Sequence, residues 1–318
     1  MHDIPIIDVS GLRSAGLAER RGIAAELGHA CRGVGFFYVT GHGIPPAVAD
    51  DIFAAARQLF ARPAAEKAAL SIVNNRGYVA MGAERLDERA AADRKEAFNI
   101  GLELPPDDAE LLAGMPFRAA NLWPELPGWR DRVLAYYAAC MALQLAIHRG
   151  FALDLGIAED FFADKMDRPA AVLRLLHYPA ATAVEAAAEA GALGAGQHSD
   201  YGNLTILATD GVAGLQVRRR DGVWLDAPHV EGAFVCNIGD CLMRWTNDVY
   251  VSTPHRVLQP ARERTSVAFF ADANPDALIE ALPGCVPPGS LARYAPVTSA
   301  AYLQGRLNAT YDHLKGAA

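Results

Sequence analysis

Short runs of β-branched and aromatic residues dominate the chain after about residue 170, and they limit its fold more than any other feature. Gly, Asp and Pro separate these runs, which are Val172–Tyr178, Leu204–Thr209, Gly214–Val217, Ala233–Ile238, Leu242–Thr246 and Thr265–Ala271. Many short strands at close spacing are typical of a sandwich or jelly roll and not of a parallel sheet. We therefore predict a mainly β fold, with a jelly-roll core and flanking helices.

The earlier part of the chain alternates strand and helix patterns. Hydrophobic spacing predicts strands at Ile4–Val9 and Gly35–Thr40, and helices at Glu19–Val34, Ala47–Phe60 and Asp131–Arg149, with a closing helix at Ala301–Leu314. We expect one structural unit in four segments. These are an N-terminal α/β support layer (residues 1–110), a helical segment that packs on the core (111–169), the jelly-roll core (170–275) and a C-terminal helical segment (276–318).

Composition excludes several classes of protein. The 318 residues carry a formal net charge of -8, and the densest basic stretch, Arg218–Arg220, precedes Asp221-Gly222 as a hairpin tip would. This balance argues against a nucleic-acid partner. No apolar run is long enough to span a bilayer, and the N-terminus lacks a signal-peptide layout. The five cysteines show no paired spacing, so we expect a reducing, cytoplasmic location and no membrane partner.

Two His-x-acid pairs are candidates for a metal site. In a strand, residues two apart point to the same side, so each pair places an imidazole and a carboxylate on one face. His229-Val230-Glu231 lies between Pro228 and Gly232, where a turn is expected, whereas His198-Ser199-Asp200 runs into a strand. We take His198-Ser199-Asp200 as the metal-binding pair. Two imidazoles and one carboxylate on one face of an iron(II) ion leave three positions open for oxygen chemistry, and His255 supplies the second imidazole.

A carboxylate-binding pair follows His255. Arg264 and Ser266 are two residues apart on a predicted strand, so a guanidinium and a hydroxyl share one face. This combination suits a charge-assisted grip on a carboxylate. A metal triad followed by such a pair is a specific signal, whereas a lone His-x-Asp is weak evidence.

These motifs together resemble the signature of the isopenicillin N synthase-like iron(II)/2-oxoglutarate dioxygenases. Flanking segments agree, including Gly35–Pro45, Lys95–Phe98 and Ser252–Val257. The resemblance covers nearly the whole chain and implies a double-stranded β-helix with Fe(II), 2-oxoglutarate and O2 as cofactor and co-substrates. It implies that Arg264 and Ser266 hold the distal carboxylate of 2-oxoglutarate. Tyr178, in an Arg-x-x-x-Tyr-Pro strand, would join them.

The implied reaction converts 2-oxoglutarate to succinate and carbon dioxide while a small-molecule substrate is hydroxylated. This chain has Leu176 where many relatives have Asn, so any polar contact from that position is absent. Two alternatives stay open. One is an iron oxidase of the same fold that closes rings or uses ascorbate, and the other is a non-catalytic jelly-roll protein that binds a metal.

Substrate contacts are predicted from two arginines. Arg174 alternates onto the same face as Tyr178, so it also faces the cavity, where it meets either a structural carboxylate or the substrate.

Ser71–Arg94 is polar and contains Gly77 and Gly82, which favours a mobile lid that supplies specificity. Within it, Arg76 is the candidate for an acidic substrate group, with a solvated loop charge as the alternative. His177 is out of phase with Tyr178 and is expected to be structural.

Overall fold

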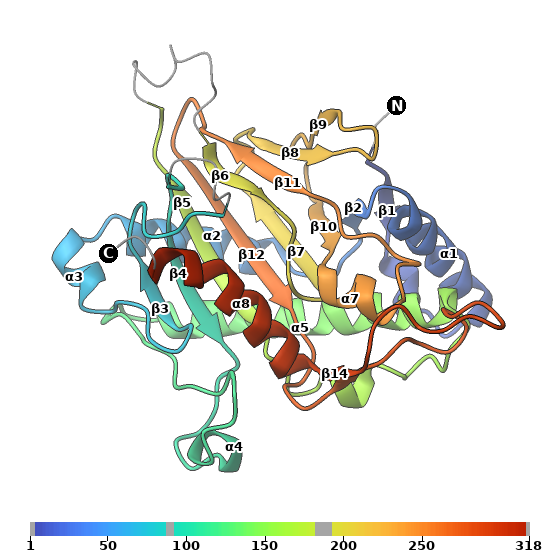
Figure 1. Ribbon diagram of the computed structural model, residues 1–318. Coiled ribbons are helices and arrows are strands. Elements are labelled where there is room, and N and C mark those ends of the chain that lie inside the picture. Colours follow the sequence, from blue (N-terminus) through green and yellow to red (C-terminus); the bar gives the residue numbers. More distant parts are fainter. Residues whose placement is uncertain (1–3, 87–91, 182–192, 316–318) are drawn as a thin grey trace.

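Two facing sheets carry the fold, and helices flank them (Figure 1). The computed structural model describes residues 4–86, 92–181 and 193–315. The large sheet has eight strands in the order β1-β2-β10-β7-β12-β5-β4-β3, and only β1 and β2 pair in parallel. Its strands are β1 (Ile6–Asp8), β2 (Phe36–Thr40), β3 (Gly77–Val79), β4 (Glu96–Gly101), β5 (Val172–Tyr178), β7 (Leu204–Thr209), β10 (Phe234–Ile238) and β12 (Arg264–Ala271).

The small sheet has four strands in the order β6-β11-β8-β9, all antiparallel. They are β6 (Leu193–His198), β8 (Leu215–Arg218), β9 (Trp224–Asp226) and β11 (His255–Leu258), and a separate pair joins β13 (Leu278–Ile279) to β14 (Val297–Thr298). The helices are α1 (Leu17–Gly33), α2 (Pro46–Phe60), α3 (Ala64–Ala68), α4 (Ala109–Leu112), α5 (Trp129–Asp154), α7 (Asp240–Trp245) and α8 (Ser299–Lys315), with 3-10 turns at Ser10–Arg13 and Ala163–Lys165.

The main hydrophobic core lies between the large sheet and helices α1, α2 and α5. Trp129 at the start of α5 is fully buried against Phe98 of β4, with ring centroids 5.6 Å apart. Its indole Nε1 donates a hydrogen bond of 2.9 Å to the carbonyl of Ala55 in α2. Buried aromatic residues contribute most when both their area and their polar atom are satisfied, as here. This contact ties α5, α2 and the sheet together.

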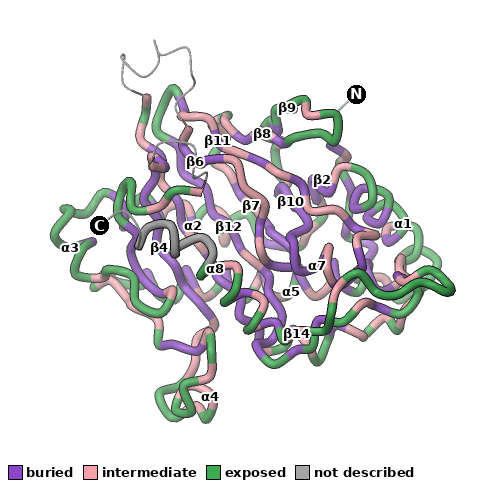
Figure 2. Tube along the Cα trace, viewed as in Figure 1, coloured by how far each residue is buried: buried purple, intermediate pink, exposed green. Residues whose placement is uncertain are grey.

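A second buried cluster lies between the two sheets and leaves room for a cavity. It combines large-sheet residues such as Val235 and Leu176 with small-sheet residues such as Val217 and Val257. The central strands are largely buried on both sides, which Figure 2 shows as purple along β10 and most of β12. Strands covered on both faces read as continuous apolar runs, which is why these segments were recognisable from the sequence.

The structure confirms the mainly β architecture with helices on its flanks, and it corrects one element. Leu242–Thr246, predicted as a strand, lies in helix α7 and the residue that ends it. Cys241, Leu242 and Trp245 are all buried, so the segment is apolar without the alternation of a half-exposed strand. A short buried run cannot be assigned to strand or helix by periodicity alone.

Part of the predicted lid contributes to the large sheet. Within Ser71–Arg94, Gly77–Val79 forms β3 at the edge of the large sheet, and residues 87–91 lie outside the described part. Tyr78 donates a hydrogen bond of 2.5 Å to Glu96, so the first half of the predicted lid is anchored.

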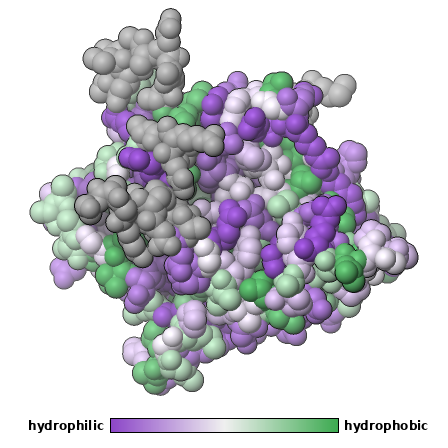
Figure 3. Space-filling view, viewed as in Figure 1, coloured by the Kyte–Doolittle hydropathy of each residue, from purple (hydrophilic) through white to green (hydrophobic). Residues whose placement is uncertain are grey.

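Figure 3 shows one face of the molecule. Among the coloured residues of Figure 3, hydrophobic ones are scattered between hydrophilic ones and form no continuous patch on that face. None of the described helices is long and apolar enough to cross a membrane. Helix α8 lies across the front of the large sheet in Figure 1, and its Leu303 and Leu307 line the cavity between the sheets.

Two glycines of α1 test how closely α1 packs on α5. A Cβ at Gly28 would lie 2.0 Å from the Asp154 carboxylate, which also binds Arg32 and Tyr250, whereas a Cβ at Gly22 would meet nothing within 4 Å. We predict that Gly28→Ala lowers the free energy of unfolding by about 1–3 kcal/mol through overpacking. Gly22→Ala should raise it by about 0.5–1 kcal/mol, because alanine is the better helix former. Urea unfolding of both variants measures this, and equal effects would contradict the packing.

Candidate active site

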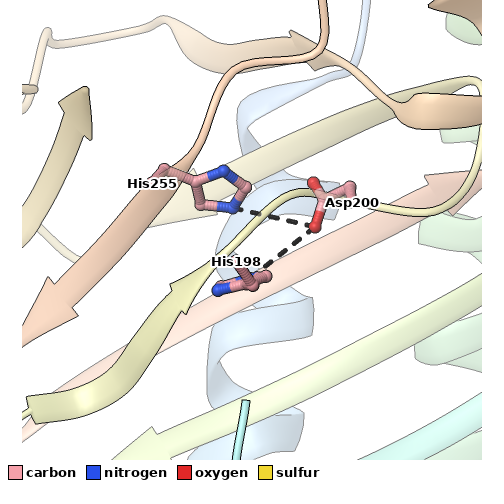
Figure 4. A group of neighbouring side chains, drawn as sticks. All are labelled: His198, Asp200 and His255. Atoms are coloured by element: carbon pink, nitrogen blue, oxygen red, sulfur yellow. Dashed lines mark ion pairs between the residues drawn. The ribbon is translucent and has the colours of Figure 1, made fainter. Parts of the chain in front are cut away.

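Three metal-ligating side chains meet where the small sheet faces the large one. His198 is the last residue of β6, His255 is the first of β11, and the two are directly paired in the antiparallel register. Asp200 follows two residues after His198, beyond the end of the strand. Figure 4 shows the imidazoles of His198 and His255 next to the Asp200 carboxylate. The ligand atoms of all three residues lie within 4.8 Å of one another.

Each imidazole has its orientation set by a backbone carbonyl. Nδ1 of His198 lies 2.7 Å from the carbonyl of Gly196, and Nδ1 of His255 lies 3.2 Å from the carbonyl of Thr253. A carbonyl only accepts hydrogen bonds, so Nδ1 carries the proton in both rings. The unprotonated Nε2 atoms lie 3.8 and 3.7 Å from Oδ1 of Asp200. Such carbonyl contacts are the usual second-sphere support of metal-binding histidines.

The Asp200 carboxylate divides its two oxygens between support and ligation. Oδ2 accepts hydrogen bonds from Thr205 at 2.5 Å and from Asn237 at 2.8 Å, two side chains of the large sheet. Oδ1 faces the two imidazoles. Burial opposes ionisation of Asp200, but the imidazoles and these two donors outweigh it and lower its pKa. Asp200 is therefore a carboxylate that points its second oxygen at the space between the rings.

The electrostatics favour a neutral imidazole at His198, the form that binds a metal. Burial, followed by the neighbouring His255, lowers the pKa of His198 to about 3. Metal ligands must be deprotonated before they bind, and this histidine meets that requirement at neutral pH. Two nitrogens and one carboxylate oxygen on one face suit iron(II) with open positions for other ligands, so the donor set fits that metal.

A cavity of about 230 Å³ opens beside the three residues. Both sheets line it, and so do residues of the N-terminal layer and α8. Every second residue of β12 and of its extension by one residue lines the cavity, as expected for one face of a strand. These residues are Arg264, Ser266, Ala268, Phe270 and, just after the strand, Asp272. The cavity therefore extends along β12. Arg264 lies at one end of it, and Asp272 and Asp200 lie toward the other end.

Arg264 and Ser266 are positioned to bind an anion. Both are 1% exposed, and Nη1 of Arg264 donates to Oγ of Ser266 at 3.2 Å while Nε donates to the carbonyl of Val212. Tyr178, directly paired with Arg264 across the strands, holds its ring 4.9 Å from the guanidinium. Arg264 makes no ion pair with any residue that the structure describes. A buried guanidinium without a counter-ion is costly, so a carboxylate ligand fits here.

The two predicted substrate arginines differ in position. Arg174 lines the cavity and forms an ion pair of 2.5 Å with Glu84, the structural carboxylate that the sequence left as one alternative. Arg76 does not line the cavity. It is 2% exposed, packs on Gly101, and donates to the carbonyls of Asn75 and Phe117, so it is not a solvated loop charge either.

The remaining histidines of the sequence argument lie where it placed them. His177 points away from the cavity and bridges Glu96 and Glu263, each at 2.8 Å. His229 belongs neither to the group of metal-ligating residues nor to the cavity lining, and among described residues its ring nitrogens lie within hydrogen-bond distance of Thr209 and the exposed Glu231. Thr205, Asn237 and Glu84 contribute to the site although the sequence did not single them out. The sequence indicated Thr205 and Asn237 only through the alternation of side chains along their strands. The two residues pair across β7 and β10 and line the cavity.

Comparison with known proteins identifies the family. The family model for the non-haem dioxygenase in morphine synthesis N-terminal region matches residues 4–126, and the 2OG-Fe(II) oxygenase superfamily model matches residues 169–273. The 2-oxoglutarate-Fe(II) type oxidoreductase hxnY of Emericella nidulans is 34% identical over 316 residues, covering 96% of this chain and 90% of the relative. The chain belongs to the 2-oxoglutarate/iron(II) oxygenase superfamily.

Solved structures agree with this assignment. A full-length Neurospora crassa protein in complex with alpha-KG, which is 2-oxoglutarate, has a TM-score of 0.88 and 32% identity, and the match covers 97% of this chain and 96% of that one. A putative 2OG-Fe(II) oxygenase family protein from Caulobacter crescentus has a TM-score of 0.85 and 31% identity, covering 96% and 99%. The predicted family and fold are confirmed. This oxygenase is a 2-oxoglutarate-dependent dioxygenase that uses Fe(II) and 2-oxoglutarate.

The metal assignment gives a direct test. We predict that His198→Ala and His255→Ala abolish stoichiometric Fe(II) binding, because each removes a ligand from a three-ligand site. His229→Ala should bind iron as the wild type does. Anaerobic iron titration followed by isothermal calorimetry measures both, and loss of binding in His229→Ala alone would overturn the assignment.

The support of Asp200 gives a second test. Asn237→Leu removes one of the two donors to Oδ2 while keeping a similar volume. We predict a loss of about 10–100-fold in iron affinity, the usual effect of removing a second-sphere hydrogen bond. The same titration measures this change, and unchanged affinity would show that Thr205 alone orients the carboxylate.

Proposed function

We propose that this oxygenase hydroxylates a small-molecule substrate while it converts 2-oxoglutarate to succinate and carbon dioxide. His198, Asp200 and His255 would hold the iron, and Arg264 with Ser266 would hold the distal carboxylate of 2-oxoglutarate. One observation carries the proposal: a buried guanidinium without an anionic partner among described residues shares one cavity with a triad of metal-ligating atoms.

The residues of the chain do the positioning. Bound iron with 2-oxoglutarate supplies the oxidising chemistry through reaction with O2. The triad would hold the iron beside the cavity, and the Arg264 grip at the other end of β12 would fix the orientation of the co-substrate. Tyr178 would add its hydroxyl to that grip. Leu176, Leu207 and Val257 line the wall between the two ends, so they exclude water where a polar side chain would retain it.

The relatives act on varied small molecules, which supports a small substrate and does not identify it. The full-length Neurospora crassa protein has also been solved with thymine, at 32% identity and a TM-score of 0.88. The homoarginine-6-hydroxylase 2-ODD-233 of rice is 34% identical over 315 residues, and the match covers 94% of this chain and 95% of the relative. Thymine and homoarginine both carry N–H groups, which the few polar side chains of a cavity can bind. Arg174, held by Glu84, is our candidate for a substrate contact on the β5 side.

The decisive experiment counts products. We expect one succinate for each substrate hydroxylated, with an atom of labelled oxygen gas incorporated into the product. A ring-closing or ascorbate-type oxidase of the same fold would consume substrate without forming succinate. Mass spectrometry of products formed under labelled oxygen, with succinate measured in the same sample, separates these reactions.

The grip on 2-oxoglutarate can be tested by truncation. We predict that Arg264→Ala raises the KM for 2-oxoglutarate by an amount equivalent to about 2–5 kcal/mol, because it leaves a buried carboxylate unpaired. Ser266→Ala should cost less, about 1–3 kcal/mol. The exposed neighbour Arg262→Ala serves as the matched control and should behave as the wild type. An unchanged KM in Arg264→Ala would mean that another residue holds the co-substrate.

A further inference from the structure

A second ionisable residue, just beyond the opposite end of β12, has no partner among the described residues. Asp272 follows the strand by one residue, is 8% exposed and lines the same cavity as Arg264. Its carboxylate makes no hydrogen bond or ion pair with any residue in the described part of the chain. A buried, unpaired carboxylate costs several kcal/mol relative to an apolar side chain unless something binds it. A ligand in the cavity that binds the Asp272 carboxylate would offset this cost.

The position of Asp272 places it at the metal end of the cavity. Phe270 and Ala271 pair with Thr205 and Leu204 of β7, and Thr205 is the residue that holds Asp200. Burial, together with the nearby charge of Asp200, raises the pKa of Asp272 to about 8. Asp272 lines the same cavity as His198, Asp200 and His255. The carboxylate thus faces the space in which a substrate approaches the metal.

The local backbone leaves room for this carboxylate. A Cβ at Gly202 would lie 2.2 Å from Oδ1 of Asp272, although the backbone of Gly202 is not in the left-handed region that requires glycine. Gly202 also lines the cavity. A side chain at this position would push Asp272 out of its place. Position 202 is a glycine because the Asp272 carboxylate occupies the space that a side chain there would need.

The other charges that line the described cavity have partners. Glu84 pairs with Arg174 and lies 3.4 Å from Lys95, which also binds Asp93. Burial alone would disfavour the Glu84 carboxylate, but the two cations outweigh it and lower its pKa to about 2. Arg264 is matched by the distal carboxylate of 2-oxoglutarate under the proposed function. Asp272 is the acid that remains. Its raised pKa means that the carboxyl keeps its proton at neutral pH when no cation lies beside it, and a cationic substrate group would favour the charged form.

We propose that Asp272 determines substrate specificity by binding a cationic nitrogen, a protonated amine or a guanidinium, next to the metal. The inference rests on the proposed function and adds a substrate class to it. One face of β12 then holds the anionic co-substrate at Arg264 and the cationic group of the substrate at Asp272. A metal is a poor alternative ligand for Asp272, because the group of three ligand residues found among described residues is the triad itself.

The test uses two probes of the same shape and different charge. n-Butylguanidinium carries the cation, and n-butylurea is its neutral counterpart. Both are titrated calorimetrically into protein loaded with Fe(II) and 2-oxoglutarate under nitrogen. We expect the wild type to bind the cation at least about tenfold more tightly, the effect of a charge-assisted hydrogen bond. Equal affinity, or binding of neither probe, overturns the proposal.

Two variants separate recognition from structure. Asp272→Asn keeps the shape of the side chain and removes its charge, so it should reduce the preference to less than about twofold. Asp276→Asn, at an exposed position in the following loop, should keep the wild-type preference. Iron titration and thermal unfolding of Asp272→Asn provide the readouts that a merely structural role would change. A preference retained in Asp272→Asn overturns the proposal.

The proposed function is checked separately on the wild-type protein. Iron-dependent formation of succinate from 2-oxoglutarate in air, without any substrate, reports on the iron and co-substrate sites alone. If succinate forms but the probes are not distinguished, the assignment of Asp272 fails and the proposed function stands. If no succinate forms, the proposed function fails, whatever the probes show.

Discussion

The direct pairing of β6 with β11 is the constraint on which the active site depends. It places His198 opposite His255, with ring centroids 4.3 Å apart, at the ends of two strands whose register the small sheet fixes. A slip of one residue would turn one imidazole to the other face. Asp200 then links this sheet to the large one, because Thr205 and Asn237 hold its second oxygen. The metal site is thus a joint between the two sheets.

The cavity owes its chemistry to the alternation of one strand. Residues of β12 that face inward bring Arg264, Ser266 and Phe270 into one line, and their neighbours in sequence pack into the core on the other side. The helices behind the sheet hold that strand in place by burying its opposite face. One face of β12 therefore contributes to stability and the other to the proposed function. This is why so short a segment can carry both the proposed co-substrate grip and, one residue beyond it, the proposed substrate contact.

Much of this was predictable from the sequence because strand alternation and motif spacing are local signals. His198, Asp200, His255, Arg264 and Tyr178 all lie where those signals placed them. Helix α7 was not predictable, since its buried run has no distinguishing period. Arg76 lies outside the lining of the cavity, and nothing in the sequence shows that Gly101 leaves space for its guanidinium. Glu84 and Asn237 act through partners far away in the chain, and such contacts appear only once the fold is known.

The central claim is that the triad and Arg264 hold iron and 2-oxoglutarate in one cavity. A crystal structure of the protein grown anaerobically with both, with anomalous data at the iron edge, tests it most directly. The account predicts one iron peak between His198, Asp200 and His255, and a 2-oxoglutarate carboxylate bound by Arg264 and Ser266. An iron peak elsewhere, or a co-substrate carboxylate away from Arg264, would contradict it.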